Sequence, residues 1–222
     1  MSAAELAALI VERQPCVVLT GAGVSTESGI PDFRSESGIW AEIDPLEVAS
    51  LRAFRRDPAR VWGFYQERIG LLRDAEPNAA HSALAELESR GLVEAVVTQN
   101  IDLLHTRAGS KDVVELHGSI RSAQCLGCLW TEPADAVLAQ LAESAVPACP
   151  KCGEVLKPGV VLFGELLPAG PMSVRLTSRA GRGSCSSSAR RSRSGQRPAF
   201  PSRRRRSRPS TAGRLRSTRK HS

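Results

Sequence analysis

The chain has 222 residues, enough for one ordinary domain or for one domain with a small insert. Its net charge of +7 combines two opposite parts. Residues 1–170 sum to −9, whereas residues 171–222 carry sixteen Lys or Arg without any Asp or Glu and sum to +16. The apolar stretch Leu6–Val11 is too short for a membrane anchor and does not resemble a signal peptide. We therefore expect a cytoplasmic protein with an acidic body and no membrane association.

Helices alternate with short apolar runs along the body. Such runs are typical of parallel strands that are covered on both faces, so the pattern predicts an α/β sheet with right-handed crossovers. The expected helices cover Ala3–Arg13, Asp57–Arg73, Asn78–Arg90 and Pro133–Glu143, and the expected strands cover Cys16–Thr20, Val93–Thr98, Val113–Leu116 and Val160–Phe163.

Three polar or glycine-rich segments each follow one of these strands. They begin at Gly21, at Gln99 and at His117. Ligands of such sheets collect outside the carboxyl ends of the strands, so we expect the three segments to share one rim.

The segment Thr20-Gly21-Ala22-Gly23-Val24-Ser25 offers small residues whose amides can approach a pyrophosphate. The spacing is not G-x-G-x-x-G, and such a turn on its own is more often only a tight turn. Its continuation, Ser28–Ser35, contains Asp32, Phe33 and Arg34 before any helix resumes. A polar loop of this kind is costly to order without a ligand, which favours a binding loop.

Four cysteines form two Cys-x-x-Cys pairs with twenty residues between them: Cys125, Cys128, Cys149 and Cys152. This spacing suits four thiolates around a tetrahedral structural zinc ion, with an iron–sulfur cluster or idle thiols as the alternatives. Four thiolates leave no open position for a catalytic water, so the chemistry must come from elsewhere. Cys16 is expected in the core, and Cys185 has no assigned role.

His117 is the best candidate for a general base, because an imidazole titrates near neutrality and this one follows a strand at the expected rim, with Asn100 and Asp102. A lone histidine after a strand is otherwise commonly structural. His81 is expected to pack inside a helix, and His105 is expected on a helix surface.

Together these segments resemble a sirtuin. The resemblance is collinear from about Leu6 to Pro168 and includes the glycine loop through Phe33-Arg34, Gln99-Asn100-Ile101-Asp102, His117-Gly118, the four cysteines and Val160–Glu165. It implies an NAD-dependent protein lysine deacylase with a Rossmann-type domain, formed by residues 1–118 and 158–170, and a zinc-binding insert at residues 119–157. Acylated lysine proteins would be the partners, and a monomer is expected.

The resemblance also implies roles for single residues. Gly21, Ala22, Gly23, Asp32, Phe33 and Arg34 would bind the dinucleotide, with Gln99, Asn100, Ile101 and Asp102 around the nicotinamide and its ribose. His117 would accept a proton, with Asn100 and Asp102 as its catalytic neighbours, while the acyl group passes to ADP-ribose and nicotinamide leaves. Val161 and Phe163 would contact the substrate.

Tyr65 and Arg68 match the Tyr-x-x-Arg pattern that reads succinyl- or malonyl-lysine in one sirtuin class. A hydroxyl and a forked guanidinium both suit a distal carboxylate. Alternatively, the two residues form a helix face that packs or pairs with solvent or Glu67.

The resemblance ends near residue 170. The C-terminal half of the sheet, which the family would place there, is missing from the sequence. Residues 171–222 are rich in Arg, Ser, Pro and Gly, as disordered segments are. A shifted reading frame in GC-rich DNA is the simplest account, which would make the chain a truncated, inactive enzyme. The alternative is a genuine basic tail that binds nucleic acid nonspecifically.

Overall fold

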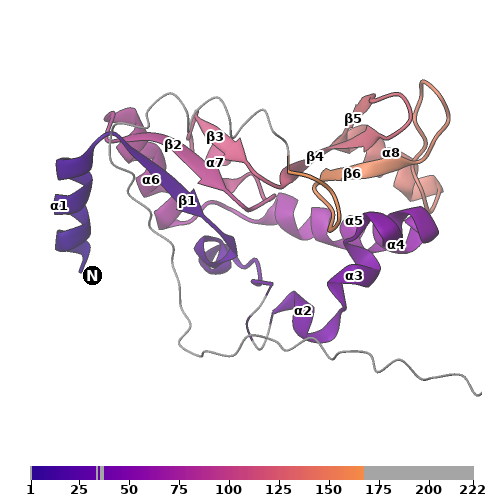
Figure 1. Cartoon of the computed structure of the whole chain (residues 1–222), viewed down its shortest axis with the longest axis horizontal. Coiled ribbons are helices and arrows are strands. Elements are labelled where there is room, and N and C mark those ends of the chain that lie inside the picture. Colours follow the sequence, from indigo (N-terminus) through magenta and orange to yellow (C-terminus); the bar gives the residue numbers. More distant parts are fainter. Residues whose placement is uncertain (1, 34, 36–37, 168–222) are drawn as a thin grey trace, which may run out of the picture. The chain divides into compact units, whose positions relative to one another are not determined.

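The computed structural model describes residues 2–33, 35 and 38–167 (Figure 1). By contacts the chain divides into residues 1–191 and residues 192–222, and every described residue belongs to the first unit. Arg34 and the basic segment 171–222, including Cys185, lie outside the described residues. The helices are α1 Ala3–Arg13, η1 Ala22–Val24, η2 Thr26–Ser28, α2 Ile39–Glu42, α3 Pro45–Val48, α4 Leu51–Arg56, α5 Pro58–Asp74, α6 Ala79–Ser89, α7 Leu104–Arg107 and α8 Ala134–Glu143.

Three strands between residues 16 and 115 form a parallel sheet. Its order is β1 (Cys16–Thr20), β2 (Val93–Thr98) and β3 (Val113–Glu115). Alternate residues of β1 are buried, and Val96 at the centre of β2 has no exposed surface. The prediction of an α/β parallel sheet is therefore confirmed.

Helix boundaries follow from local signals. Asp57 accepts a hydrogen bond from the amide of Arg60, and Pro58 fills the first turn of α5, where a missing N–H costs nothing. Asn78 caps α6 in the same way. Gly91, at φ +73°, ends that helical stretch in a conformation that glycine adopts without strain.

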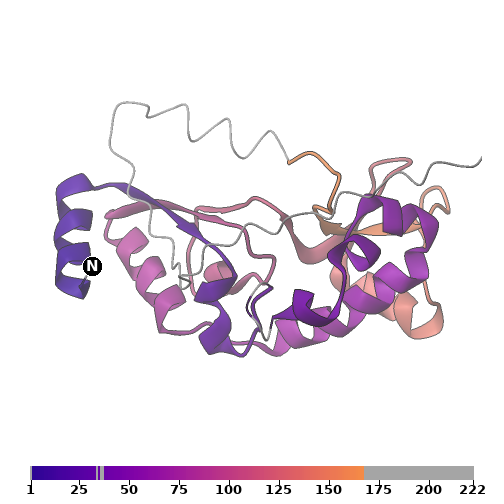
Figure 2. The same ribbon diagram turned by 60° about the horizontal axis from the view of Figure 1, so that its bottom comes forward.

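A second, antiparallel sheet holds the cysteines. It consists of β5 (Thr131–Pro133), β4 (Gly118–Cys125) and β6 (Leu156–Val160), in that order, with α8 packed against it. Figures 1 and 2 show this sheet in pink and orange, away from the indigo strand β1 in the same unit. The expected strand at Val160–Phe163 is therefore wrong: the strand ends at Val160, and Phe163 makes only an isolated parallel bridge to Ser50.

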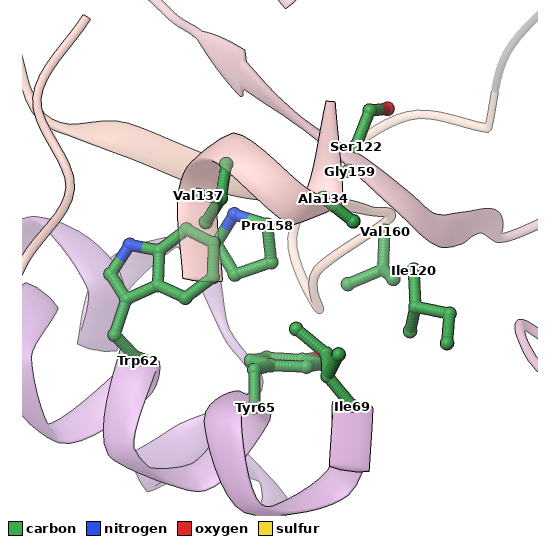
Figure 3. Close-up of a pocket in the computed structure, with 10 residues that line it drawn as sticks. All are labelled: Trp62, Tyr65, Ile69, Ile120, Ser122, Ala134, Val137, Pro158, Gly159 and Val160. Atoms are coloured by element: carbon green, nitrogen blue, oxygen red, sulfur yellow. The ribbon is translucent and has the colours of Figure 1, made fainter. Parts of the chain in front are cut away.

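The long helix α5 packs against the cysteine-bearing sheet, and the two share one core. The parallel sheet has a separate core cluster of Val18, Val93 and Val96. Trp62, Tyr65 and Ile69 project from α5 toward Val137 of α8 and Val160 of β6 (Figure 3). The indole Nε1 of Trp62 donates a hydrogen bond of 2.7 Å to the carbonyl of Leu156. The gap left between these side chains is about 10 Å³, room for about one water molecule. It is a packing defect, too small for a cofactor. No helix among residues 2–33, 35 and 38–167 is long and apolar enough to cross a membrane.

Candidate active site

The three predicted segments meet at the carboxyl end of the parallel sheet. The amide of Gln99 donates to the carbonyl of Thr20 over 3.0 Å, which joins the ends of β1 and β2. The amide of Leu116 donates to the carbonyl of Thr98 over 2.9 Å, which joins β2 to β3. The shared rim that the sequence predicted is thus present.

Behind this rim lies a buried polar network. The hydroxyl of Ser25 donates to Asp102 Oδ2 over 2.7 Å and accepts from the side-chain nitrogen Nδ2 of Asn100 over 3.0 Å. The other Asp102 oxygen accepts from the amide of Leu104 at the start of α7. Ser25, Asn100 and Asp102 are all buried. The Asp102 carboxylate thus accepts two hydrogen bonds, and Ser25 links it to Asn100. The glycine loop and the Asn100 segment are therefore held in one arrangement.

Two buried histidines complete the network. Their rings lie 4.8 Å apart, with His81 Nε2 3.5 Å from Ser25 Oγ and His105 Nε2 2.9 Å from Thr20 Oγ1. Burial lowers the pKa of His81, and Asp102 opposes this shift. Burial, with a further contribution from His81, lowers the pKa of His105 to about 4. Both rings are therefore neutral near pH 7. The expectation that His105 lies on a helix surface is wrong, because the α6–α7 packing encloses it.

His117 differs from the other two because its ring is only partly buried. Its Nδ1 lies 2.9 Å from the carbonyl oxygen of Gln99. A carbonyl can only accept a hydrogen bond, so Nδ1 carries the proton of the neutral ring, and in that form Nε2 keeps its lone pair. The backbone around the ring is fixed as well, because the amide of Val161 donates to the carbonyl of His117 over 2.8 Å. His117 is thus presented as a proton acceptor at Nε2.

The glycine loop folds as two consecutive 3-10 turns, η1 and η2. Ala22 and Gly23 begin η1, and the first amides of a helical turn have no partner within that turn. Thr26–Ser28 follows, and Gly29 ends the pair at φ +81°. The predicted loop is therefore an ordered turn directly above β1.

Phe33 starts a stack of aromatic rings. The ring centroids of Phe33 and Trp40 are 5.3 Å apart, and those of Trp40 and Phe64 are 5.8 Å apart. The Asp32 carboxylate accepts from the amide of Ser35 and so shapes its own loop. Arg34 of the same predicted cluster lies outside the described residues.

Tyr65 and Arg68 occupy different surroundings on α5. Tyr65 is buried against the cysteine-bearing sheet (Figure 3), and burial raises the pKa of its hydroxyl. The Arg68 guanidinium lies 3.5 Å from the Phe64 ring centroid and donates to the Phe64 carbonyl. Its Nη1 is 3.8 Å from Glu67, as the packing alternative expects, yet Arg68 Nε is buried without a hydrogen-bond partner among the described residues.

The four cysteines predicted to bind metal are together. All four Sγ atoms lie within 4.8 Å of one another, with Cys125–Cys152 at 3.5 Å and Cys128–Cys149 at 3.6 Å. Ligands 2.3 Å from a tetrahedral zinc ion are about 3.8 Å apart, so the cluster fits zinc. The amide of Cys128 donates to Cys125 Sγ, and this contact is the largest of several hydrogen bonds that lower the pKa of the Cys125 thiol to about 7. The cluster can therefore hold a structural zinc ion.

The sequence interpretation missed Ser25 as a member of the site. Its place within the Gly21–Gly29 loop was visible, but only the fold shows that its hydroxyl links Asp102 and Asn100. No local feature of the sequence indicated that His105 is buried in the same network. Its burial depends on Thr20 and His81, both distant in sequence.

Comparisons with known proteins define the class. The sequence profile of the Sir2 family matches residues 21–180. An NAD-dependent protein deacylase of Pyrococcus furiosus is 47% identical over 167 residues, which are 74% of this chain and 66% of the relative. NAD-dependent protein deacylase 2 of Archaeoglobus fulgidus is 50% identical over 163 residues, 73% of this chain and 64% of the relative.

A solved Sir2 structure shares the fold. It contains a deacetylated p53 peptide and 3'-O-acetyl ADP ribose. The two chains are 42% identical and superpose with a TM-score of 0.73, over 78% of this chain and 70% of the other. The chain therefore belongs to the Sir2 family. It spans slightly less than two thirds of the length of the two deacylases named above.

Proposed function

We propose that the protein is an NAD-dependent protein lysine deacylase. Its support is Sir2 membership, together with relatives named NAD-dependent protein deacylases and a Sir2 structure with a deacetylated peptide and an acetyl ADP ribose. NAD would be a co-substrate that releases nicotinamide and leaves ADP-ribose as the acyl acceptor. The finer roles below are proposals of the same kind.

The His117 geometry carries this proposal. With Nδ1 donating to the Gln99 carbonyl, Nε2 is left to take a proton from a ribose hydroxyl, and a positioned base of this kind contributes about 10²–10⁴-fold to a rate. Asn100 and Asp102, fixed through Ser25, would position the nicotinamide ribose beside it. Gln99 and Ile101 would line the same end of the dinucleotide.

The other half of the dinucleotide would bind at the glycine loop. Gly21, Ala22 and Gly23 would approach the phosphates, with Asp32, Phe33 and Arg34 closing the loop over them. Val161 and Phe163 would contact the acylated peptide, since their segment adjoins His117 through the contact from Val161. The division into residues 1–118 with 158–170 and residues 119–157 stays a prediction.

The decisive experiment is nicotinamide release by the 222-residue chain with NAD and an acetyl-lysine peptide. His117→Ala is expected to reduce the rate by at least about 100-fold, because the base is lost. Arg90→Met is a matched control, since it removes a cation from an exposed pair with Glu86. Absence of nicotinamide release by the parent chain, or an unaltered rate in His117→Ala, would show that the proposal is wrong.

A preference for acidic acyl groups is the finer proposal. It is supported by Arg68, whose buried Nε lacks a partner among the described residues and lies on the same helix as Tyr65. A succinyl carboxylate would supply that partner. Tyr65→Phe combined with Arg68→Met is expected to lower succinyl-lysine turnover at least tenfold more than acetyl-lysine turnover. An equal loss for both substrates would assign the two residues to packing.

A further inference from the structure

Outside the site just described, one buried ion pair has no role in the proposed chemistry. Lys157, the second residue of β6, and Glu165 pair over 3.1 Å, with side chains only 4% and 19% exposed. Charged residues are rarely so buried unless the surrounding structure depends on their pairing. The segment between them, which contains Val161 and Phe163, is the one proposed to contact substrate.

That segment is a tight turn. The amide of Glu165 donates to the carbonyl of Leu162 over 3.0 Å, and Gly164 adopts φ +91°. A positive φ at the third of four residues is typical of a type II turn, with Phe163 in the second position. The side chain of Phe163 is half exposed, while its backbone bonds to Ala49 and Leu51 on both sides.

Lys157 and Glu165 bond this turn from within. The ammonium of Lys157 has three acceptors: the carbonyls of Pro158 and Val160, at 3.0 and 2.6 Å, and Glu165 Oε2. An ammonium has three protons, so this set uses all of them. The same Glu165 oxygen accepts from the amide of Leu162 over 2.7 Å. One ion pair thus joins the end of β6 to both ends of the turn.

We infer that Lys157 and Glu165 are positioning residues, whose ion pair holds the turn Leu162–Glu165, and with it Phe163, in the place where acylated peptide would bind beside His117. The inference rests on the proposed function for the identity of the peptide. Neither residue contacts the reacting atoms. Removing one partner leaves an unpaired buried charge, so the turn opens toward solvent.

The ion pair could instead stabilise the cysteine-bearing sheet as a whole. The two roles differ in which backbone amides lose their protection from hydrogen exchange when the ion pair is removed. A positioning role exposes the amides of Leu162 and Glu165 to exchange. It spares the amide of Leu156, at the far end of β6, which donates to the carbonyl of Pro147. A purely structural role accelerates exchange at all three amides together.

Amide hydrogen exchange of the 222-residue chain, followed by NMR, tests this difference. Lys157→Met is expected to accelerate exchange of the Leu162 and Glu165 amides at least tenfold and leave that of Leu156 unchanged. Glu165→Gln keeps an oxygen for Leu162 and is expected to have a smaller effect, so it serves if Lys157→Met does not fold. Parental exchange rates at the turn, or equal acceleration at Leu156, overturn the inference.

Binding of a fluorescent acetyl-lysine peptide, measured without NAD so that the proposed reaction cannot consume the peptide, gives the second readout. Lys157→Met is expected to weaken binding at least tenfold, with Lys157→Arg close to the parent and Arg90→Met unchanged. If Lys157→Met opens the turn but binds the peptide as tightly as the parent, the ion pair does not position substrate. If the parent chain does not bind the peptide, the proposed function is wrong, while the exchange rates still decide what the ion pair holds.

Discussion

Mild acid is expected to destabilise the fold through His105. This ring is 1% exposed, and its Nδ1 has no hydrogen-bond partner among the described residues. Burial and the neighbouring His81 hold its pKa at about 4, against 6.5 in an unfolded chain. Between these two values the unfolded chain binds a proton that the folded chain does not, so stability falls as the pH falls.

The size of the effect follows from the two pKa values. Linkage gives a loss of about 2 kcal/mol in the free energy of unfolding between pH 7 and pH 5, and the loss levels off below about pH 4. His81 shifts in the same direction and adds to this loss. Asp102 opposes both shifts, because its negative charge favours the protonated rings.

Urea unfolding followed by circular dichroism, at pH 8, 7 and 5, measures the effect. In His105→Gln the drop from pH 7 to pH 5 is expected to be smaller than in the parent by about 2 kcal/mol, since this titration is gone. Between pH 8 and 7 the two proteins are expected to change equally, because His105 is then largely neutral in both states. A parental pH dependence in the variant would refute the assignment of this titration to His105.

Three further predictions concern metal and packing. Cys149→Ser is expected to abolish a zinc content of about one ion per chain, measured by elemental analysis, and full retention would contradict the four-thiolate site. Gly118→Ala is expected to destabilise by about 2–5 kcal/mol, because a Cβ there would lie 2.2 Å from a backbone oxygen at φ +69°, whereas Gly63→Ala, with open space on α5, should gain about 0.5–1 kcal/mol. Equal urea midpoints for these two variants would disprove the steric argument. Trp62→Phe should cost about 1–3 kcal/mol by stranding the Leu156 carbonyl, and a cost near zero would count against that bond.

The boundaries of helices and strands could be predicted where residues adjacent in the sequence determine them. The boundaries of α5 and α6 were predicted to within one residue from Asp57-Pro58, Asn78 and Gly91, since caps act on the adjacent turn. The bounds of β1 and β2 were predicted because both are buried apolar runs. The rim residues followed from topology alone, since parallel strands end at one edge.

Non-local pairing explains the failures. The apolar run at Val160–Phe163 suggested a strand, yet the strand contains Pro158 and Gly159, which strands disfavour. Gly159 is required because a Cβ there would lie 2.4 Å from the carbonyl of Ser122 on β4. That close approach depends on a partner strand more than thirty residues away, so no local pattern encodes it.

His117 stands on the two-residue link between β3, which ends at Glu115, and β4, which begins at Gly118. Its ring is anchored to the parallel sheet through Gln99, and its carbonyl is anchored to Val161, just beyond β6. Two parts of the fold therefore hold this residue: the parallel sheet fixes the ring, and the segment after β6 fixes the backbone. If His117 is the proposed proton acceptor, loss of the zinc ion proposed at the cysteines would disturb the second of these supports and turn the ring without contacting any reacting atom.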